Sequence, residues 1–181
     1  MIYTPQEIEK AVGSLGLRLA RDYSGKPLVL LGVLKGALYF TVDLARALAA
    51  VPDGPSEIFV DYLCVERYGD VTESKRPVRL LLDEGTRLDG RHVVIVEDIA
   101  DNGLTLEFLR TLLLGRHPAT LRTCALFDKP SRRQVQVPLD YTGLMVPNTF
   151  VVGYGLDYQE RYRNLPYLAE LNIEESQPEL T

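Results

Sequence analysis

The sequence predicts an α/β domain built on an open, mainly parallel, twisted sheet flanked by helices. Several short runs are dense in Val, Ile and Leu, as in strands that are buried on both faces. Helical patterns alternate with these runs, which is the strand–helix–strand order of a parallel sheet. The 181 residues, 46% of them hydrophobic and 25% charged, suit one domain with a substantial core. No repeat or linker divides the sequence, so we expect a single domain over residues 1–181.

The first helix has a clear start signal. Thr4 occupies the expected N-cap position, Pro5 the first helical position and Glu7 the third, which is the pattern of a capping box. An apolar stripe at helical spacing follows, formed by Ile8, Val12, Leu15 and Leu19. The segment is therefore predicted to be an amphipathic helix.

The remaining elements follow from apolar runs and helical spacing. Buried strands are predicted at residues 27–34, 78–82, 92–96, 120–126 and 149–153, and helices at residues 37–50 and 104–114. Residues 58–82 also contain a polar, turn-rich middle, so we predict a long hairpin whose tip, about residues 66–77, is a mobile lid. The tail, residues 174–181, is predicted to be disordered.

Composition and charge exclude several classes of protein. The 20 basic and 25 acidic residues give a net charge of -5, which argues against binding nucleic acid by broad phosphate neutralisation. Cys64 and Cys124 support neither a disulfide framework nor a zinc ribbon, and the isolated His92 and His117 support no catalytic triad. The longest apolar stretch, Leu28 to Leu34, is too short to span a membrane, and no signal peptide is recognisable. We expect a cytoplasmic protein that binds no membrane.

The most informative segment joins a strand to a helix. An apolar strand ends in Glu97 and Asp98, and a short loop containing Asp101 leads into a helix at Leu104. Ligands of open α/β sheets bind beyond the carboxyl ends of the strands, and a helix N-terminus offers N–H groups to a phosphate. Three carboxylates beside an anion site suit a ligand that also brings hydroxyls or Mg²⁺, as a sugar phosphate does. The alternative is an acidic turn in which Asp101 or Asn102 only caps the helix.

These residues carry a family resemblance. The run Val-Glu-Asp-Ile-Ala-Asp-Asn-Gly-Leu-Thr, residues 96–105, resembles the phosphoribosyl-pyrophosphate (PRPP) motif of type I phosphoribosyltransferases in its hypoxanthine-guanine form. Leu34-Lys35-Gly36 is similar to that branch's pyrophosphate loop, and residues 127–132 to its purine-contacting lysine segment. Residues 150–158 and 163–166 are similar to its C-terminal hood. The resemblance extends to about residue 171 and implies the type I phosphoribosyltransferase fold, with a lid and a small hood formed by about residues 149–171 and the N-terminal segment.

The resemblance also implies a role for each matching residue. Asp101 would be the general base that takes or shares the purine N7 proton. Glu97 and Asp98 would hold the ribose hydroxyls and one Mg²⁺, and Asp157 would bind a second Mg²⁺. Phosphate and pyrophosphate would be bound by Asp101, Asn102, Gly103, Leu104, Thr105, Lys35, Gly36 and Arg163. The purine would be bound by Ile99, Lys129, Phe150, Val151 and Asp157, with Lys129 donating to O6 and Phe150 stacking on the ring.

Two positions depart from the family pattern. Arg67 precedes Tyr68 and Gly69 in the predicted lid, where the family usually has serine before the tyrosine. Asn102 stands in the phosphate loop where the family usually has threonine or serine, so we expect a weakened phosphate contact. Arg67 either reaches the pyrophosphate or is solvated.

Two smaller expectations concern neighbouring loops. In the family the Lys–Gly peptide of the pyrophosphate loop, here Lys35–Gly36, is often cis. Arg132 and Arg133 follow the lysine segment and form either a basic patch or a solvated turn, and we predict the turn.

The resemblance implies a Mg²⁺-dependent enzyme of purine salvage. It would transfer phosphoribosyl from PRPP to hypoxanthine or guanine, giving IMP or GMP and pyrophosphate, and would work as a homodimer or homotetramer. One alternative is a PRPP- or nucleotide-sensing regulator on the same scaffold that binds RNA, against which the acidic balance, Asp101 and Lys129 argue. A second alternative is a non-catalytic paralogue, suggested by Asn102 and Arg67.

Overall fold

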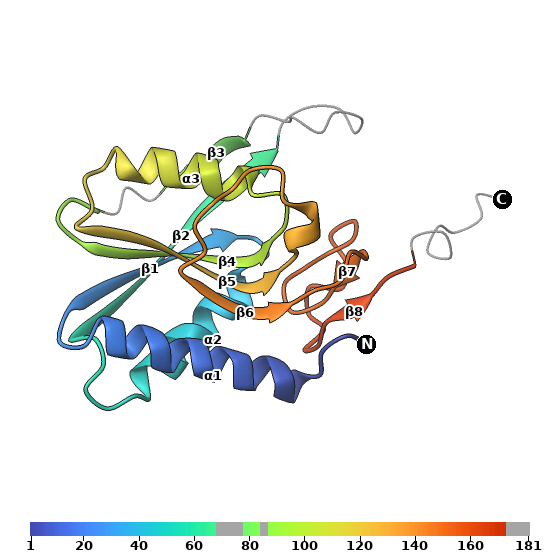
Figure 1. The fold of residues 1–181 in the computed structure, drawn as a ribbon, viewed down its shortest axis with the longest axis horizontal. Helices are drawn as coiled ribbons and strands as arrows, with labels where there is room; N and C mark the ends of the chain where they lie inside the picture. Colours follow the sequence, from blue (N-terminus) through green and yellow to red (C-terminus); the bar gives the residue numbers. More distant parts are fainter. Residues whose placement is uncertain (68–77, 84–86, 173–181) are drawn as a thin grey trace.

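A six-stranded sheet with helices on both faces forms the centre of the computed structural model (Figure 1). The structure describes residues 1–67, 78–83 and 87–172. In chain order the elements are α1 (Pro5–Asp22), β1 (Pro27–Leu34), α2 (Leu38–Ala49), β2 (Glu57–Arg67), β3 (Val78–Asp83), β4 (His92–Ala100), α3 (Leu104–Leu114), β5 (Thr120–Asp128), the 3-10 helix η1 (Pro130–Arg132), β6 (Tyr141–Met145), β7 (Val151–Val152) and β8 (Ala169–Glu170). The strand order is β3-β2-β1-β4-β5-β6, and every neighbouring pair is parallel except β2 and β3. The predicted fold class is therefore confirmed.

The alternation of side chains along the central strands explains the layers. Leu28 and Leu30 of β1 belong to the core that α1 and α2 cover, whereas Val29 and Leu31 belong to the core on the α3 side. β4, the next strand, is buried in the same way on both faces. Continuous apolar runs are typical of strands covered by helices on both sides, so this part of the sheet follows directly from the sequence.

Two predicted strands differ from the structure. The run at residues 149–153 does not enter the parallel sheet, because β7 pairs with β8 in a separate two-stranded antiparallel sheet. The sixth strand of the main sheet is β6, which the sequence analysis did not predict, and which alternates poorly because most of its residues are half-buried at the sheet edge. The run at residues 78–82 forms β3, an antiparallel edge strand in which Leu81 is exposed, so its predicted burial on both faces is wrong.

The hairpin prediction for residues 58–82 is confirmed by the antiparallel pairing of β2 with β3. Most of its predicted lid, residues 68–77, lies outside the described residues, as does the predicted disordered tail. Tyr3 forms an isolated antiparallel bridge with Leu168, which joins the N-terminal segment to the chain just before β8. Within the described residues, no helix has both the length and the apolar character that a membrane crossing requires.

The start of α1 is built as predicted. The Thr4 hydroxyl accepts a hydrogen bond from the Glu7 backbone N–H at 3.3 Å, and the Glu7 carboxylate accepts one from the Thr4 N–H at 2.8 Å. Both bonds of a capping box are therefore present, and they satisfy donors that the helix itself leaves unpaired.

Replacing Gly13 with alanine is expected to raise the free energy of unfolding by about 0.5–1 kcal/mol, the gain for Gly to Ala in a helix interior. Gly13 lies on the exposed face of α1, and a Cβ added there meets no atom within 4 Å. Gly16→Ala is the matched control in the same helix, because its Cβ would lie 2.9 Å from the Ala47 Cβ of α2. Urea unfolding should show Gly13→Ala stabilising and Gly16→Ala destabilising. A loss of stability in Gly13→Ala would contradict the prediction.

Candidate active site

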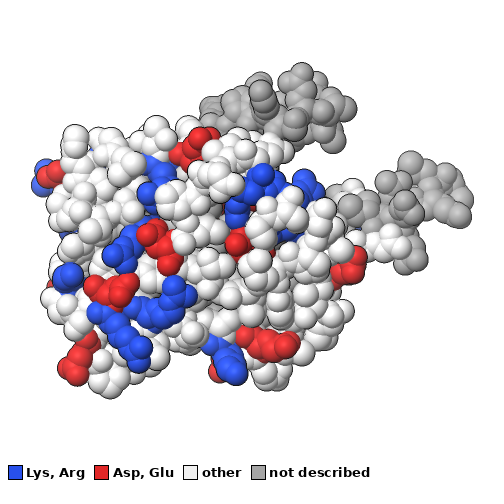
Figure 2. All heavy atoms as spheres, in the orientation of Figure 1, with Lys and Arg blue, Asp and Glu red and all other residues white. Residues whose placement is uncertain are grey.

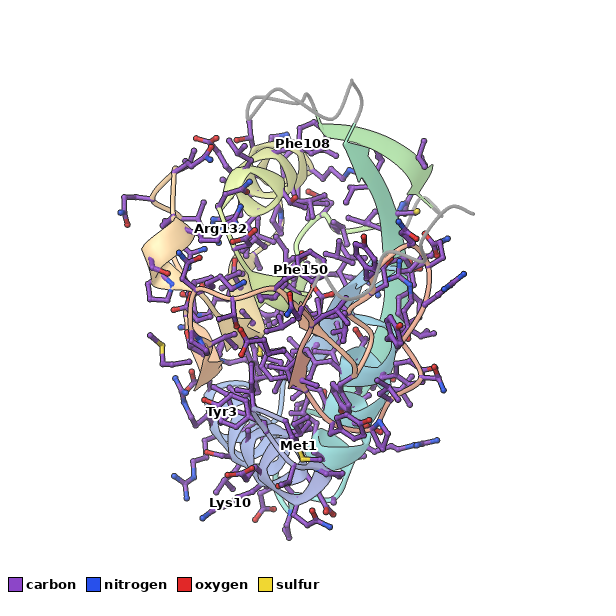
Figure 3. All side chains as sticks on the ribbon, turned by 90° about the vertical axis from the view of Figure 1, so that its right-hand side faces the viewer. Met1, Tyr3, Lys10, Phe108, Arg132 and Phe150 are labelled. Atoms are coloured by element: carbon purple, nitrogen blue, oxygen red, sulfur yellow. The ribbon has the colours of Figure 1, made fainter. Side chains whose placement is uncertain are left out.

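The candidate residues lie at one end of the sheet, where three parallel strands end. β1 leads into Lys35, β4 into Asp101 and β5 into Lys129, each directly after the last residue of the strand. Because parallel strands share one direction, their carboxyl ends meet, and this is where open α/β sheets bind ligands. Figure 3 looks onto this side of the molecule, with Arg132 and Phe150 labelled between α3 and α1. The predicted segments are thus brought together in space.

A cavity of about 310 Å³ opens between the end of β5 and the segment around β7. All the residues predicted to bind the purine line it, together with Asp101: Ile99, Lys129, Phe150, Val151 and Asp157. Phe150 is 40% exposed and meets the ring of Tyr158 edge-on, with the centroids 5.6 Å apart. The Phe150 ring therefore lines a space of the size that small-molecule sites use.

Lys129 supplies the positive charge of this cavity. Only 5% of the residue is exposed, and its ammonium donates a hydrogen bond to the Thr149 carbonyl at 2.6 Å. Burial lowers the pKa of Lys129, and the carboxylate of Asp101 opposes this shift. A buried ammonium with one carbonyl partner retains further donors for a ligand.

The loop from Asp101 to Gly103 begins α3. Gly103 adopts φ +89°, and the Leu104 N–H donates to the Asn102 side-chain oxygen at 3.1 Å. The Asn102 side chain therefore turns back onto its own loop, although the N-cap residue of α3 is Gly103 and neither Asp101 nor Asn102 occupies the cap position. A small hollow of about 20 Å³ lies at this helix N-terminus, lined in part by Glu97 and Thr105.

The acidic residues lie beside this loop. Glu97 and Asp98 are buried, with 9% and 8% of each residue exposed. Burial raises the pKa of Asp98 to about 6, although its carboxylate accepts a hydrogen bond from the Ile99 N–H at 2.7 Å. Asp157 pairs with Arg163 at 2.8 Å and accepts from the Glu160 N–H at 2.9 Å. Within residues 1–67, 78–83 and 87–172, no three His, Cys, Asp or Glu side chains lie close enough to hold a metal by themselves.

The loop after β1 contacts both the acids and the segment after β7. A Cβ on Gly36 would lie 1.7 Å from the Asp98 carboxylate, and one on Gly155 would lie 1.9 Å from the Gly36 carbonyl oxygen. Lys35 forms an ion pair with Glu160 at 3.0 Å. The Arg163 guanidinium donates to the Gly155 carbonyl at 2.8 Å. Lys35, Gly36 and Arg163 therefore share one region, next to Asp98.

Comparison with known proteins agrees with this arrangement. Residues 1–159 match the phosphoribosyl transferase domain family. Hypoxanthine-guanine phosphoribosyltransferase of Dictyostelium discoideum is 41% identical over 175 residues, which cover 96% of each chain. The chain belongs to the phosphoribosyltransferase family, in its hypoxanthine-guanine branch. The Mycobacterium avium enzyme of the same name is 42% identical over 178 residues, covering 95% of this chain and 85% of that one. A hypoxanthine phosphoribosyltransferase structure from Staphylococcus aureus has a TM-score of 0.89 and 38% identity, and the match covers 98% of this chain and 93% of that one.

Two expectations for this phosphoribosyltransferase need correction. The cis peptide bond lies between Leu34 and Lys35, one residue before the expected Lys35–Gly36 bond. Arg133 is not in a solvated turn, because its side chain is 9% exposed and pairs with the Asp128 carboxylate. The reason is that η1 turns the chain back across the end of β5.

Asp101 has a partner that was not predicted from the sequence. The Arg132 Nε lies 3.2 Å from an Asp101 carboxylate oxygen, and the two side chains are 52% and 29% exposed. Two consecutive arginines after a lysine segment were the available signal. Of the lid residues, Arg67 ends β2, whereas Tyr68 and Gly69 lie outside the described part of this phosphoribosyltransferase.

Proposed function

We propose that this chain transfers the phosphoribosyl group of PRPP to hypoxanthine or guanine in purine salvage, giving IMP or GMP and pyrophosphate. The observation that carries the proposal is the cavity of about 310 Å³ in which Lys129 and Asp101 both form part of the wall, beside the N-terminus of α3. Relatives named hypoxanthine-guanine phosphoribosyltransferases, 41% and 42% identical over nearly the whole chain, support the choice of substrates.

The reaction exchanges one bond at C1 of the ribose for another. The bond between C1 and the pyrophosphate oxygen breaks, and its electron pair leaves with the pyrophosphate, while purine N9 bonds to C1. The N7 proton passes to the Asp101 carboxylate, which acts as the general base. Carboxylates near an oxocarbenium-like sugar and cations near the leaving group would stabilise the charges that develop. The 5′-phosphate would be bound by the loop from Asp101 to Thr105 at the helix N-terminus.

Lys129 explains the choice of a 6-oxopurine. Its ammonium has donors and no acceptor, so it would donate to O6 of hypoxanthine or guanine. With adenine it would face the amino hydrogens, and a buried charged donor would lose its partner. Phe150 would stack on the ring, and the Val151 main chain would contact its edge.

Pyrophosphate would bind near Lys35, Gly36 and Arg163. Both cations are paired with carboxylates in the structure, Lys35 with Glu160 and Arg163 with Asp157. We expect pyrophosphate to take over these cations as their partner, since a phosphate accepts bidentate hydrogen bonds from a guanidinium.

The carboxylates fit Mg²⁺ as a cofactor. Mg²⁺ prefers oxygen ligands and is usually bound by one or two carboxylates together with substrate phosphates and water. Glu97 and Asp98 would hold one ion and Asp157 a second, which is consistent with the lack of a three-acid cluster among the described residues. Burial raises the pKa of Asp98, and a cation bound beside it would favour its charged form. Bound by these carboxylates, Mg²⁺ would supply positive charge to stabilise the pyrophosphate leaving group.

The decisive assay incubates the protein with PRPP, Mg²⁺ and each of hypoxanthine, guanine and adenine, and follows nucleotide formation. We expect IMP and GMP, little AMP, and loss of activity in EDTA that excess Mg²⁺ restores. No product with any base would overturn the enzyme and support a regulator or a non-catalytic paralogue. On the face shown in Figure 2, basic and acidic side chains are interspersed.

Lys129→Ala is expected to lower the ratio of kcat/KM for hypoxanthine to kcat/KM for adenine by about 10–100-fold, the value of a hydrogen bond to a charged group. Steady-state kinetics with both bases at saturating PRPP measures this ratio. Lys26→Ala, which removes an exposed lysine between α1 and β1, is the control and should leave the ratio unchanged. An unaltered preference in Lys129→Ala would refute the assigned role.

We also propose a cytoplasmic homodimer or homotetramer. The assembly is what membership of the hypoxanthine-guanine branch suggests, and a solved relative from Trypanosoma cruzi is described in terms of its oligomeric state. Sedimentation equilibrium tests this assembly, and a monomer at all concentrations would contradict it.

A further inference from the structure

The carbonyl groups of the loop before α3 all have partners in the structure. The Ala100 carbonyl accepts from the Lys129 N–H at 3.0 Å, and the Asn102 carbonyl accepts from the N–H groups of Gln134 and Val135 at 2.9 and 3.1 Å. The Asp101 carbonyl accepts from the Arg133 guanidinium at 3.0 Å. The segment after β5 therefore binds three successive carbonyls, that of Ala100 at the end of β4 and those of Asp101 and Asn102 in the loop.

Because these carbonyls are held by the segment after β5, the directions of the N–H groups in the same peptides are fixed as well. In a trans peptide the C=O and the following N–H point in opposite directions. The peptides of this loop are trans, since the cis bond of the described residues is the one between Leu34 and Lys35. With their carbonyls turned toward the segment after β5, the peptides of this loop turn the N–H groups of Asp101, Asn102 and Gly103 away from it. Successive N–H groups on one side of a loop at a helix N-terminus form a concavity that suits an anion.

Arg133 is the one side chain among these donors. Its guanidinium reaches the Asp101 carbonyl with Nη1 and pairs with the Asp128 carboxylate through Nη2. The two side chains are 9% and 14% exposed, so the charge of Arg133 is balanced locally and its position is fixed by packing. It also lies directly behind Gly103, where an added Cβ would meet the Arg133 Cδ at 3.2 Å and the Val135 carbonyl at 2.5 Å.

We propose that Arg133 is a positioning residue that orients the loop from Asp101 to Gly103 for the 5′-phosphate. It acts through the Asp101 carbonyl and does not itself touch the substrate. Without the guanidinium, the peptide between Asp101 and Asn102 loses its charged donor and can rotate, which would turn a carbonyl toward the phosphate. This inference rests on the proposed function, since it concerns the phosphate site of that reaction.

Arg133→Gln is the direct test, with kinetics for both substrates and calorimetric titration of ribose 5-phosphate. We expect the KM for PRPP and the dissociation constant for ribose 5-phosphate to rise about tenfold or more, as misplaced binding groups allow. The KM for hypoxanthine at saturating PRPP should stay within about threefold, because the Lys129 ammonium that would bind the purine is held by the Thr149 carbonyl and not by this loop. A merely structural role would loosen the end of β5 and raise both KM values, because Asp128 and Lys129 are adjacent.

Two conservative variants keep the test valid if Arg133→Gln fails to fold. Arg133→Lys keeps the charge but can reach only one of the two acceptors, and Asp128→Asn keeps an oxygen that can accept from Arg133. Both should raise the PRPP KM less than Arg133→Gln. Arg122→Gln is the matched control, because it removes an arginine that is ion-paired with Asp22 at 2.8 Å at the opposite end of β5.

The outcomes separate this inference from the function on which it rests. A parallel rise of both KM values, or an unchanged PRPP KM in all Arg133 and Asp128 variants, would overturn the role of Arg133 while leaving the transferase intact. A wild-type protein that neither binds ribose 5-phosphate nor forms nucleotide would overturn the proposed function itself.

Discussion

Replacing Asp101 with asparagine is expected to lower kcat by about 10²–10⁴-fold, the usual contribution of a general base, while the KM for PRPP changes little. The carboxamide has nearly the same shape but cannot take the purine N7 proton. The loop should survive the change, because Arg133 bonds the Asp101 main-chain carbonyl and not its side chain. The ion pair with Arg132 is lost, but both groups are partly exposed, so the cost in stability is at most about 1 kcal/mol.

Steady-state kinetics and calorimetric titration of PRPP together test this prediction. Asp89→Asn, at an exposed loop position before β4, is the matched control and should leave both constants unchanged. If instead PRPP affinity collapsed while turnover of the bound complex stayed normal, Asp101 would be a ligand of PRPP and not the base.

The central strands of the sheet could be predicted because both of their faces are buried. β1 and β4 are continuous apolar runs because helices cover both sides of them. β6 contains Gly143 and mostly half-buried residues, so neither a run nor an alternation marks it. The run at residues 149–153 is equally apolar, but it is buried in a second, smaller sheet. Apolar patterns indicate that a segment is buried but not which strand it pairs with. Residues 149–153 were therefore predicted to lie in the main sheet, and β6 was not predicted.

In the site too, residues that lie in one short segment could be predicted, whereas contacts between residues far apart in the sequence could not. Glu97, Asp98 and Asp101 could be recognised because one contiguous strand, loop and helix carries them, and the structure brings the lysine segment to the same cavity. The partners of Arg133 could not be predicted, since its bond to the Asp101 carbonyl joins residues 32 positions apart and depends on how η1 turns the chain. Sequence reasoning therefore predicts which groups would carry the chemistry, but it does not predict the long-range contacts, such as that of Arg133 with the Asp101 carbonyl, that the structure places around them.

Replacing Gly155 with alanine is expected to lower the free energy of unfolding by about 2–5 kcal/mol and kcat/KM for PRPP by about 100-fold. Gly155 has φ +101°, and its added Cβ would lie 1.9 Å from the carbonyl oxygen of Gly36. The left-handed conformation costs an L-residue about 1–2 kcal/mol, and overpacking costs about 1–3 kcal/mol more. The clash involves backbone on both sides, so it can be relieved only by moving the segment after β7 away from the loop that contains Gly36. A shift of about 1 Å in a binding loop is enough for the kinetic loss.

A matched glycine separates the two contributions. Gly25 also has positive φ, +68°, but an added Cβ meets nothing within 4 Å, so Gly25→Ala should cost only the conformational part, about 1–2 kcal/mol, and should leave kcat/KM unchanged. The difference between the two variants in urea unfolding measures the contact between Gly155 and Gly36. If Gly155→Ala lost no more stability than Gly25→Ala and kept its PRPP kinetics, the two segments would not be in the tight contact that the structure has. If stability fell without a kinetic effect, the loop of Lys35 and Gly36 would not be the pyrophosphate site.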